Sequence, residues 1–484
     1  MLFNSIEFAF FLPVVFLIYW AIGFAHIGDT RKLRLQNAFV VAASYVFYGW
    51  WDWRFLLLIA FTSFCSWGSG LLIDKARKAG VKRSRFWLWL NIAINIGILA
   101  AFKYYDFFVT EFGHLFGIRT DNILLHVILP VGISFYTFQA LSYSIDVYRQ
   151  KIAPTRDMIA FFAFIAFFPQ LVAGPIERAT SLLPQFLTNR KFSYDQAADG
   201  MRQILWGLFK KIVIADNCAT YVDQVWASCS SQTGSTLLLA AVLFTFQIYC
   251  DFSGYSDIAI GTAKLFGIRL MRNFNNPYFS RDIAEFWRRW HISLTTWFRD
   301  YIYIPLGGSR VSKGKIIRNT FIIFLVSGIW HGANWTFLLW GTYHALLFLP
   351  LILAGANRRY TNQVAEGRFV PGWRETAQLL LTFMLVVIGW VIFRAPDMSS
   401  CLLYLQGLCD ASLFSLPRAG AARQIPTILC ILIMMVTEWC QRNKQHGLEI
   451  NNQPWYIRYP LYIAIAGLIF YLGEESQTFI YFQF

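Results

Sequence analysis

A segment without a single charged residue, residues 320–357, limits what this chain can fold into. A helix needs about 20 mostly apolar residues to cross the hydrocarbon core of a bilayer, and this segment is long enough for two. His331, Gly332, Ala333 and Asn334 lie near its middle, where they can form a connection. The segment therefore predicts two consecutive membrane helices.

Other apolar stretches recur along the chain and predict a polytopic, all-α membrane protein. The longer ones are residues 8–28, 55–73, 86–102, 122–145, 158–176, 235–250 and 376–393, and the shorter ones are residues 38–51, 424–437 and 459–473. Together they predict about ten to twelve membrane segments. Composition agrees, because 57% of the residues are hydrophobic and 14% are charged, whereas soluble domains carry about 25% charged residues. A water-soluble or disordered chain is excluded.

Basic residues in the connections predict the orientation of the first helices. Two connections are rich in them and contain Arg31, Lys32 and Arg34, then Lys75, Arg77, Lys78, Lys82, Arg83 and Arg85. The connections at residues 50–54 and 103–121 have no basic excess. Loops rich in Lys and Arg stay in the cytoplasm, so the N-terminus is predicted to lie outside it. The same alternation brings residues 146–151 to the cytoplasmic side.

One apolar run differs from a regular spanning helix. Pro169, Gly174 and Pro175 interrupt residues 158–176. Broken backbone at membrane depth persists only where protein or a water-filled cavity satisfies its polar groups. We therefore predict a discontinuous or re-entrant segment that borders other parts of the protein or a water-filled cavity.

The segment after it, residues 201–212, has apolar side chains at helical spacing, with Arg202, Lys210 and Lys211 off that stripe. This pattern predicts a helix lying in the membrane interface. Neither a repeat nor a Pro- or Gly-rich linker divides the chain, so residues 1–484 are predicted to form one membrane domain.

Neither the cysteines nor the positive charge predicts a metal or nucleic-acid site. The eight cysteines form no Cys-x-x-Cys or other metal-ligand spacing. The net charge of +15 is explained by basic inner loops, and no basic and aromatic groove pattern appears. The chain also contains no Walker loop, dinucleotide fingerprint or serine nucleophile motif. We predict no metal, no bound cofactor and no nucleic-acid partner.

Residues 254–318 form a basic segment, with eleven Lys or Arg against four Asp or Glu, and we predict that it is cytoplasmic. Within it, residues 283–301 carry apolar side chains on one helical face, and Glu285, Arg288, Arg299 and Asp300 on the opposite face. His291 lies at the margin of the apolar face. That position suits either a structural imidazole or a group that faces a cavity.

His331 is the stronger candidate for chemistry. It lies in an uncharged membrane run between Gly328 and Gly332, where small residues leave the imidazole approachable by a ligand. The alternative is a buried histidine that hydrogen-bonds a neighbouring helix. Polar residues at membrane depth are costly to keep, which favours the functional interpretation.

The chemistry that suits such a histidine is acyl transfer from a thioester. A neutral imidazole, with an ordinary pKa of about 6.5, accepts a hydroxyl proton near neutral pH. A thioester is already activated, so the protein must supply only a base, alignment and stabilisation of the oxyanion. His344, in the same uncharged segment, is interpreted as a packing residue. Asp251 and Asp257 are expected to cap or pair with basic residues, with ion pairing favoured.

Several motifs in order resemble the membrane-bound O-acyltransferase superfamily, and most closely its bacterial alginate O-acetylation branch. The motifs are residues 130–138, 168–175, 251–257, 286–294 and 330–334, and the ends at residues 1–5 and 481–484 also look typical. The strong resemblance covers residues 125–350, which form the motif-bearing core.

The resemblance implies a bundle of membrane helices, some short and tilted, around a tunnel. His331 corresponds to the family's characteristic histidine, and His291 to the second histidine of the bacterial branch. It implies an acetyl-CoA or carrier-protein thioester as donor, and an extracytoplasmic polysaccharide as final acceptor. A separate periplasmic acetyltransferase with a Ser-His-Asp site often completes the transfer, at the bacterial inner membrane.

The basic segment and the resemblance together suggest a donor site. Six basic residues are candidates to attract the donor phosphates: Lys264, Arg269, Arg272, Arg281, Arg288 and Arg289. Ordinary positive charge of an inner loop explains each of them equally well. Two other functions stay open: a transporter that passes an acetyl compound outward without bond chemistry, and an acyltransferase acting on a lipid or a D-alanylated carrier. Alginate, cellulose and peptidoglycan are not distinguished as acceptors.

Overall fold

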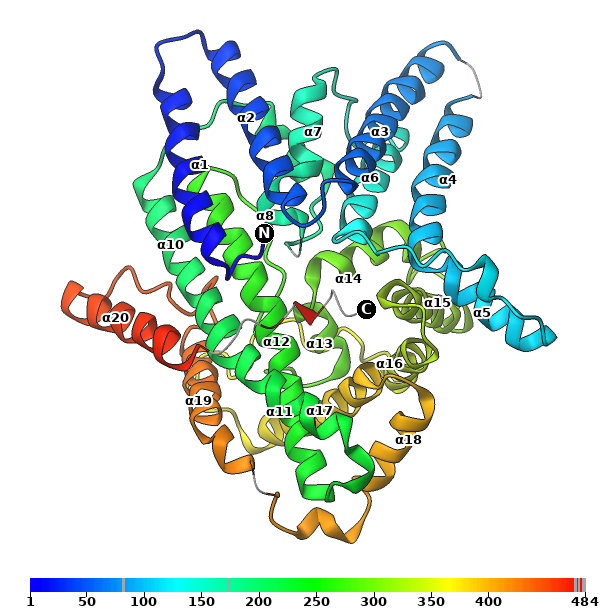
Figure 1. Cartoon of the computed structure of the whole chain (residues 1–484), viewed down its shortest axis with the longest axis vertical. Coiled ribbons are helices and arrows are strands. Elements are labelled where there is room, and N and C mark those ends of the chain that lie inside the picture. The colour runs from blue at the N-terminus through cyan, green and yellow to red at the C-terminus, as the bar shows by residue number, and fades with distance from the viewer. Residues whose placement is uncertain (81–82, 173, 419, 474–476, 478, 481–484) are drawn as a thin grey trace. The chain divides into compact units, whose positions relative to one another are not determined.

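Every regular element among the described residues is a helix (Figure 1). The computed structural model describes residues 1–80, 83–172, 174–418, 420–473, 477 and 479–480. Lys82, Ala173 and the motif at residues 481–484 lie outside them. Eight helices are long and apolar enough to cross a membrane, which confirms the all-α, polytopic fold class. They are α1 (Ile6–Phe24), α3 (Phe55–Lys78), α4 (Ser84–Lys103), α12 (Gly234–Leu265), α16 (Trp335–Leu353), α17 (Trp373–Arg394), α19 (Ile425–Cys440) with the turn before it, and α20 (Trp455–Leu472).

The eight are fewer than the ten to twelve segments predicted. α2 (Asp29–Gly49) and α15 (Lys313–His331) are long but carry charged residues in their first turns. α6 (Ile133–Tyr148) has 16 residues. The predicted span at residues 122–145 is wrong in its first half, because residues 124–130 form no helix and Pro130 disfavours helical backbone before it.

The chain divides into two compact units. Unit 1 consists of residues 1–201 and 258–271, and unit 2 of residues 202–257 and 272–484. Each unit thus contains a part of the long helix α12. Both candidate histidines, His291 and His331, belong to unit 2.

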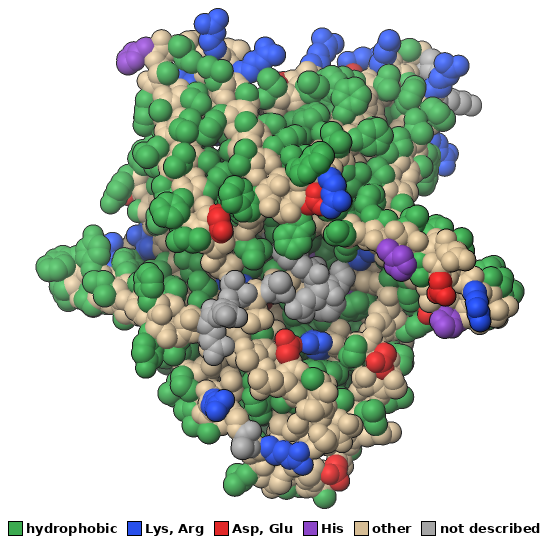
Figure 2. All heavy atoms as spheres, in the orientation of Figure 1, with side chains coloured by type: hydrophobic (Ala, Val, Ile, Leu, Met, Phe, Trp, Pro, Cys, Tyr) green, Lys and Arg blue, Asp and Glu red, His purple; other side chains and the backbone are tan. Residues whose placement is uncertain are grey.

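In unit 1, the basic connections lie at one end, as the orientation argument requires. The α1–α2 and α3–α4 connections are at the same end of the unit (Figure 1). The guanidinium of Arg77, in the last turn of α3, donates to the carbonyl oxygen of Val147 near the end of α6 at 3.2 Å, which brings the α6–α7 connection there too. Figure 2 shows Lys and Arg gathered at this end and hydrophobic side chains over the visible helix faces below it.

The predicted interruption of residues 158–176 is present in unit 1. The run forms α7 (Met158–Ala166) and the short α8 (Phe168–Leu171), followed by irregular backbone. Gly132 passes next to the end of α8 with a positive φ of 72°, and a Cβ there would collide with the carbonyl oxygen of Leu171. The remaining helices that lie wholly in unit 1 are α5 (Tyr105–Phe116) and α9 (Ala179–Phe186).

Unit 2 contains the membrane helices α16, α17, α19 and α20 and a set of shorter elements. The latter include the π-helical segments η2 (Phe209–Asp216) and η4 (Arg299–Tyr303), and helices α11 (Asn217–Ala227), α13 (Ile283–Arg289), α14 (Ile292–Phe298) and α18 (Met398–Gly407). Helix α10 (Tyr194–Leu208) begins in unit 1 and ends in unit 2. The single helix predicted for residues 283–301 is wrong, because the backbone breaks at His291, whose φ is 44°.

A buried ion network in unit 2 overturns the interfacial helix predicted for residues 201–212. Nζ of Lys210 lies 2.6 Å from the Asp257 carboxylate, and Nζ of Lys211 lies 2.7 Å from both Asp216 and Asp251. The two lysine side chains are 3% and 1% exposed. The two lysines lie off the apolar stripe because they face buried carboxylates and not water, since a buried charge needs a partner. Ion pairing of Asp251 and Asp257 is confirmed, with η2 as the source of the partners.

Candidate active site

His331 is the last residue of α15, and its side chain is 6% exposed. Gly332 follows in extended backbone, and the Asn334 side chain caps α16 by accepting a hydrogen bond from the N–H of Thr336 at 3.0 Å. The Asn334 amide also donates to the carbonyl oxygen of Pro396 at 2.7 Å. The predicted division of residues 320–357 at this connection is confirmed.

Aromatic rings surround the imidazole of His331. The ring centroids of Trp330, Trp340 and Phe393 lie 4.9, 5.1 and 5.1 Å from its own. Such surroundings keep bulk water away, and electrostatic interactions are stronger where water is excluded. A polar reaction at this imidazole therefore takes place in a dry environment.

Two glycines allow α15 and α16 to pack closely enough to place this histidine. A Cβ on Gly328 would lie under 3.0 Å from the carbonyl oxygen of Phe337, and a Cβ on Gly341 under 3.0 Å from that of Phe324. Small residues at reciprocal positions let helix backbones approach closely within membranes. The position of His331, one turn after Gly328, depends on this close approach.

His291 lies at the break between α13 and α14 and is 1% exposed. Its ring contacts Phe252 edge to face at 4.6 Å, and Trp330 at 6.0 Å between centroids. Trp330 therefore contacts both predicted histidines. Burial lowers the pKa of His291 to about 3, so the ring is neutral near pH 7.

His344 belongs to the same aromatic cluster and lies in α16. Nε1 of Trp287 donates to its Nδ1 at 3.3 Å, and the Trp340 ring lies 5.0 Å away. On the other side, a Cβ on Gly389 of α17 would lie 2.9 Å from its Nε2. Trp287 contacts His344 and also lines the cavity described next, whereas His344 is not among the described lining residues. The packing role of His344 stays a prediction.

Unit 2 contains a cavity of about 610 Å³ whose described lining residues include sequence neighbours of the two histidines but neither histidine itself. Ser327, one turn before His331, and Ile292, the neighbour of His291, both line it, together with Trp287. Most of the wall is apolar, but three guanidinium groups line it, those of Arg288, Arg299 and Arg358. Cavities of roughly 300 to 1,000 Å³ with a few placed polar groups hold small ligands or cofactors. Positive charge in an apolar cavity favours an anionic ligand with an apolar portion.

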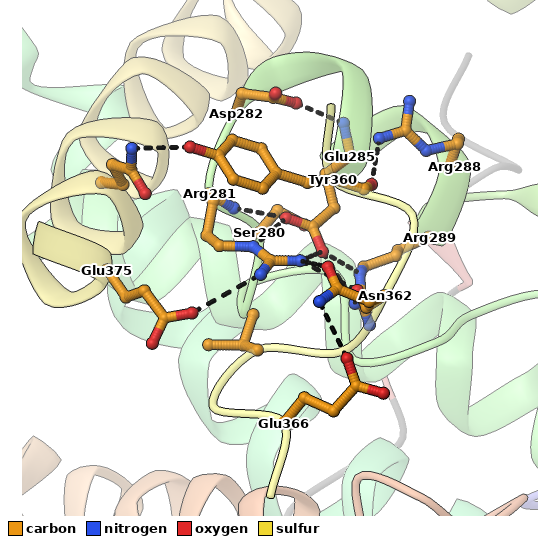
Figure 3. Close-up of polar contacts among 12 residues, drawn as sticks. Ser280, Arg281, Asp282, Glu285, Arg288, Arg289, Tyr360, Asn362, Glu366 and Glu375 are labelled. Carbon is orange, nitrogen blue, oxygen red and sulfur yellow. Dashed lines mark hydrogen bonds and ion pairs between the residues drawn. The ribbon is translucent and has the colours of Figure 1, made fainter. Parts of the chain in front are cut away.

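Of the six basic residues predicted to attract phosphates, two are held in a buried ion pair (Figure 3). The Glu285 carboxylate accepts from Arg281 Nε at 3.0 Å and from Arg289 Nη2 at 2.8 Å. Glu285 itself is 1% exposed, which corrects its predicted position on an outward polar face. Lys264 pairs with Asp199 in unit 1 at 2.5 Å. Arg288 lines the cavity, and its role toward donor phosphates stays a prediction.

The same arginines fix the α16–α17 connection, residues 354–372, against α13 (Figure 3). Arg281 donates to the carbonyl oxygen of Asn362 at 2.8 Å, and its guanidinium lies 4.4 Å from the Tyr360 ring centroid. Arg288 donates to the carbonyl oxygens of Asn357 at 2.9 Å and Tyr360 at 2.6 Å. Because Asn357 and its neighbour Arg358 line the cavity, these bonds build part of its wall.

Two of the three cavity arginines, Arg299 and Arg358, were not among the predicted phosphate-binding residues. Arg299 falls in the basic segment, but helical periodicity placed it on an outward face. Arg358 lies in the connection after the uncharged segment, where the sequence contains no signal for it. The pairing of Arg281 and Arg289 with Glu285 could be predicted from the sequence, because four-residue spacing brings opposite charges together on a helix.

Comparisons with known proteins identify the family of this chain. The model of the membrane-bound O-acyltransferase family (MBOAT) matches residues 149–392, a range that contains His291 and His331. The Pseudomonas aeruginosa protein described as "Probable alginate O-acetylase AlgI" is 42% identical over 82% of this chain and 73% of its own length. The "Peptidoglycan O-acetyltransferase" of Helicobacter pylori is 32% identical over 100% of this chain and 98% of its own length.

A more distant relative, the "Teichoic acid D-alanyltransferase" of Bacillus subtilis, is 27% identical over 54% of this chain and 68% of its own length. The names of the three relatives describe acetylation of alginate, acetylation of peptidoglycan and D-alanylation of teichoic acid. The polytopic helical fold, the family match and the extent of these similarities agree. The chain is an acyltransferase and belongs to the membrane-bound O-acyltransferase family.

Proposed function

We propose that this protein takes an acetyl group from a cytoplasmic thioester donor, acetyl-CoA, for the O-acetylation of an extracytoplasmic polysaccharide of the alginate type. The proposal places it in a bacterial inner membrane, with the N-terminus on the extracytoplasmic side. The observation that carries it is the arginine-lined cavity, whose wall includes Ile292, the neighbour of His291, and Ser327, one turn before His331. The 42% identity to an alginate O-acetylase supports the acceptor class.

In this proposal His331 is the general base. As the acceptor hydroxyl oxygen bonds to the acetyl carbonyl carbon, its proton moves to His331, the C–S bond breaks, and the leaving thiolate takes up a proton. Alternatively, the imidazole carries the acetyl group transiently. His291, whose ring also contacts Trp330, orients the reacting groups or assists the proton transfer.

The three cavity arginines, Arg288, Arg299 and Arg358, are proposed to bind the donor phosphates. Guanidinium groups bind phosphate through paired, charge-assisted hydrogen bonds. The apolar wall next to Ser327 and Ile292 would then receive the acyl thioester end. This arrangement brings the thioester toward the two histidines.

The final acceptor lies outside the membrane, and we propose that a periplasmic acetyltransferase with a Ser-His-Asp site accepts the acetyl group and passes it to the polysaccharide. Polysaccharide synthesis and secretion proteins are the expected neighbours. Peptidoglycan is a second candidate acceptor, because the Helicobacter pylori relative that spans the whole chain is named for it.

Replacing His331 tests the chemical proposal in cells. The variant His331→Ala is expected to abolish glycan acetylation while the protein accumulates normally in the membrane. His114→Ala is the matched control, since His114 is an exposed histidine in α5 of unit 1. Acetylation by the His331→Ala variant at the level of the control would overturn the assignment. Mass spectrometry of the purified glycans distinguishes alginate from peptidoglycan as acceptor.

A further inference from the structure

Asn273 holds the imidazole of His291, although neither the sequence motifs nor the cavity includes it. It lies in the connection between α12 and α13 and is fully buried. Its Oδ1 is 3.2 Å from Nδ1 of His291. The same oxygen lies 3.2 Å from the backbone nitrogen and 2.9 Å from the hydroxyl oxygen of Ser293.

The Ser293 contacts determine which Asn273 atom faces the histidine. A backbone N–H can only donate, so the side-chain atom facing it must be the amide oxygen and not the amide nitrogen. The amide nitrogen points the other way and donates to the Ser256 hydroxyl at 3.3 Å. An amide oxygen only accepts, so Nδ1 of His291 must carry the hydrogen of their shared bond.

Backbone pairing holds the two segments together around this bond. The Ile292 N–H donates to the carbonyl oxygen of Asn273 at 2.9 Å, and the Asn275 N–H donates to that of Arg289 at 2.9 Å. His291 itself has a left-handed φ of 44°, a conformation that costs a non-glycine residue free energy and persists only when its surroundings impose it. The histidine is therefore fixed on both its backbone and its Nδ1 side.

We infer that Asn273 is the positioning residue that keeps His291 as its Nδ1–H tautomer, so that Nε2 acts as the accepting atom in the reaction. The inference rests on the proposed acyl transfer and extends it, because it assigns a direction to the second histidine. A neutral imidazole has one donor and one acceptor nitrogen, and the partner of one nitrogen sets the role of the other. At metal sites, mutating the residue that hydrogen-bonds a ligand histidine lowers metal affinity or activity about 10- to 100-fold.

Among the described residues, the rings in contact with His291 carry no charge. Its ring neighbours are Phe252, Phe274 and Trp330. Several charged groups on adjacent elements are held in ion pairs: on α12 Asp251 with Lys211 and Asp257 with Lys210, and on α13 Glu285 with Arg281 and Arg289. Arg288 of α13 donates to backbone carbonyl oxygens. On α15, the titratable neighbour beyond Trp330 is His331.

Nitrogen NMR tests the tautomer without needing activity. The full-length protein, labelled with ¹⁵N-histidine and purified in detergent micelles, is compared with His291→Gln to identify the His291 signals. The expected result is a protonated Nδ1 and an unprotonated Nε2 in the wild type, and a mixture of tautomers in Asn273→Leu. A protonated Nε2 in the wild type, or an unchanged spectrum in Asn273→Leu, would overturn the inference.

Kinetics with ¹⁴C-labelled acetyl-CoA complete the test. Asn273→Leu should lower kcat about 10- to 100-fold with little change in KM, and Asn273→Asp, which keeps the accepting oxygen, should restore most of the rate. Ser256→Ala, which removes only the bond to the amide nitrogen, should behave as the wild type. Equal losses in Ser256→Ala and Asn273→Leu would overturn a role for the oxygen. If the wild type releases no CoA, the proposed function fails, while the NMR result still decides the tautomer.

Discussion

Replacing Gly328 by alanine is expected to impair both folding and catalysis, because it separates the helices that place His331. A Cβ at this position would lie under 3.0 Å from the backbone oxygen of Phe337, whereas ordinary contacts need 3.4 Å or more. The obstacle is backbone and not a flexible side chain, so α15 and α16 must move apart. Overpacking of this kind costs about 1–3 kcal/mol of unfolding free energy. A shift on the order of 1 Å at a reacting group lowers the rate about 100-fold.

Gly467→Ala in α20 is the matched control. No atom lies within 4 Å of a Cβ built there, and alanine in a helix interior is favoured over glycine by up to about 1 kcal/mol. Both variants are compared by thermal unfolding in detergent and by acetyl transfer from labelled acetyl-CoA. Gly328→Ala should lose stability and activity, and Gly467→Ala neither. Wild-type activity in Gly328→Ala would refute the link between this helix contact and His331.

Three further predictions concern charge. Lys211→Met leaves Asp216 and Asp251 buried without their cation and should cost about 3–5 kcal/mol, whereas the exposed control Lys75→Met should stay within about 0.5 kcal/mol by thermal unfolding. Because His291 stays neutral in the folded protein down to about pH 3, while the unfolded chain takes up its proton below about pH 6.5, stability should fall as the pH drops below that value. This group changes the free energy of unfolding by at most about 1.4 kcal/mol per pH unit. In His291→Gln, the free energy of unfolding measured across that pH range should depend less on pH. Arg358→Ala should raise KM for acetyl-CoA about 10-fold with kcat unchanged; an unchanged KM would remove Arg358 from the donor site.

Helical periodicity and the length of uncharged stretches predicted the all-helical membrane fold and the helix break after His331, which local sequence determines. The break after His331 was predictable because Gly332 and Asn334 favour a helix end and a new cap. The break at His291 was not, since no Pro or Gly occurs there. The left-handed residue at this break contacts Asn273, eighteen positions earlier in the chain, and such a contact has no signature in residue spacing.

The burial of charge was the least predictable feature. Lys210 and Lys211 followed the pattern of an exposed helix face, but their carboxylate partners lie mostly on α12, which periodicity alone does not bring near. The cavity also combines residues that no sequence motif groups together. Arg299 and Arg358 meet there because the Arg281 and Arg288 bonds hold the α16–α17 connection against α13.

The central claim is that His331 performs acyl transfer and that the protein is not merely a path for an acetyl compound. The most direct measurement uses purified protein in liposomes supplied with acetyl-CoA labelled in the acetyl group, and follows free CoA and labelled products on both sides of the membrane. The account predicts CoA release by the wild type and none by His331→Ala. Equal CoA release by the two proteins, or outward movement of an intact acetyl compound without CoA release, would contradict it.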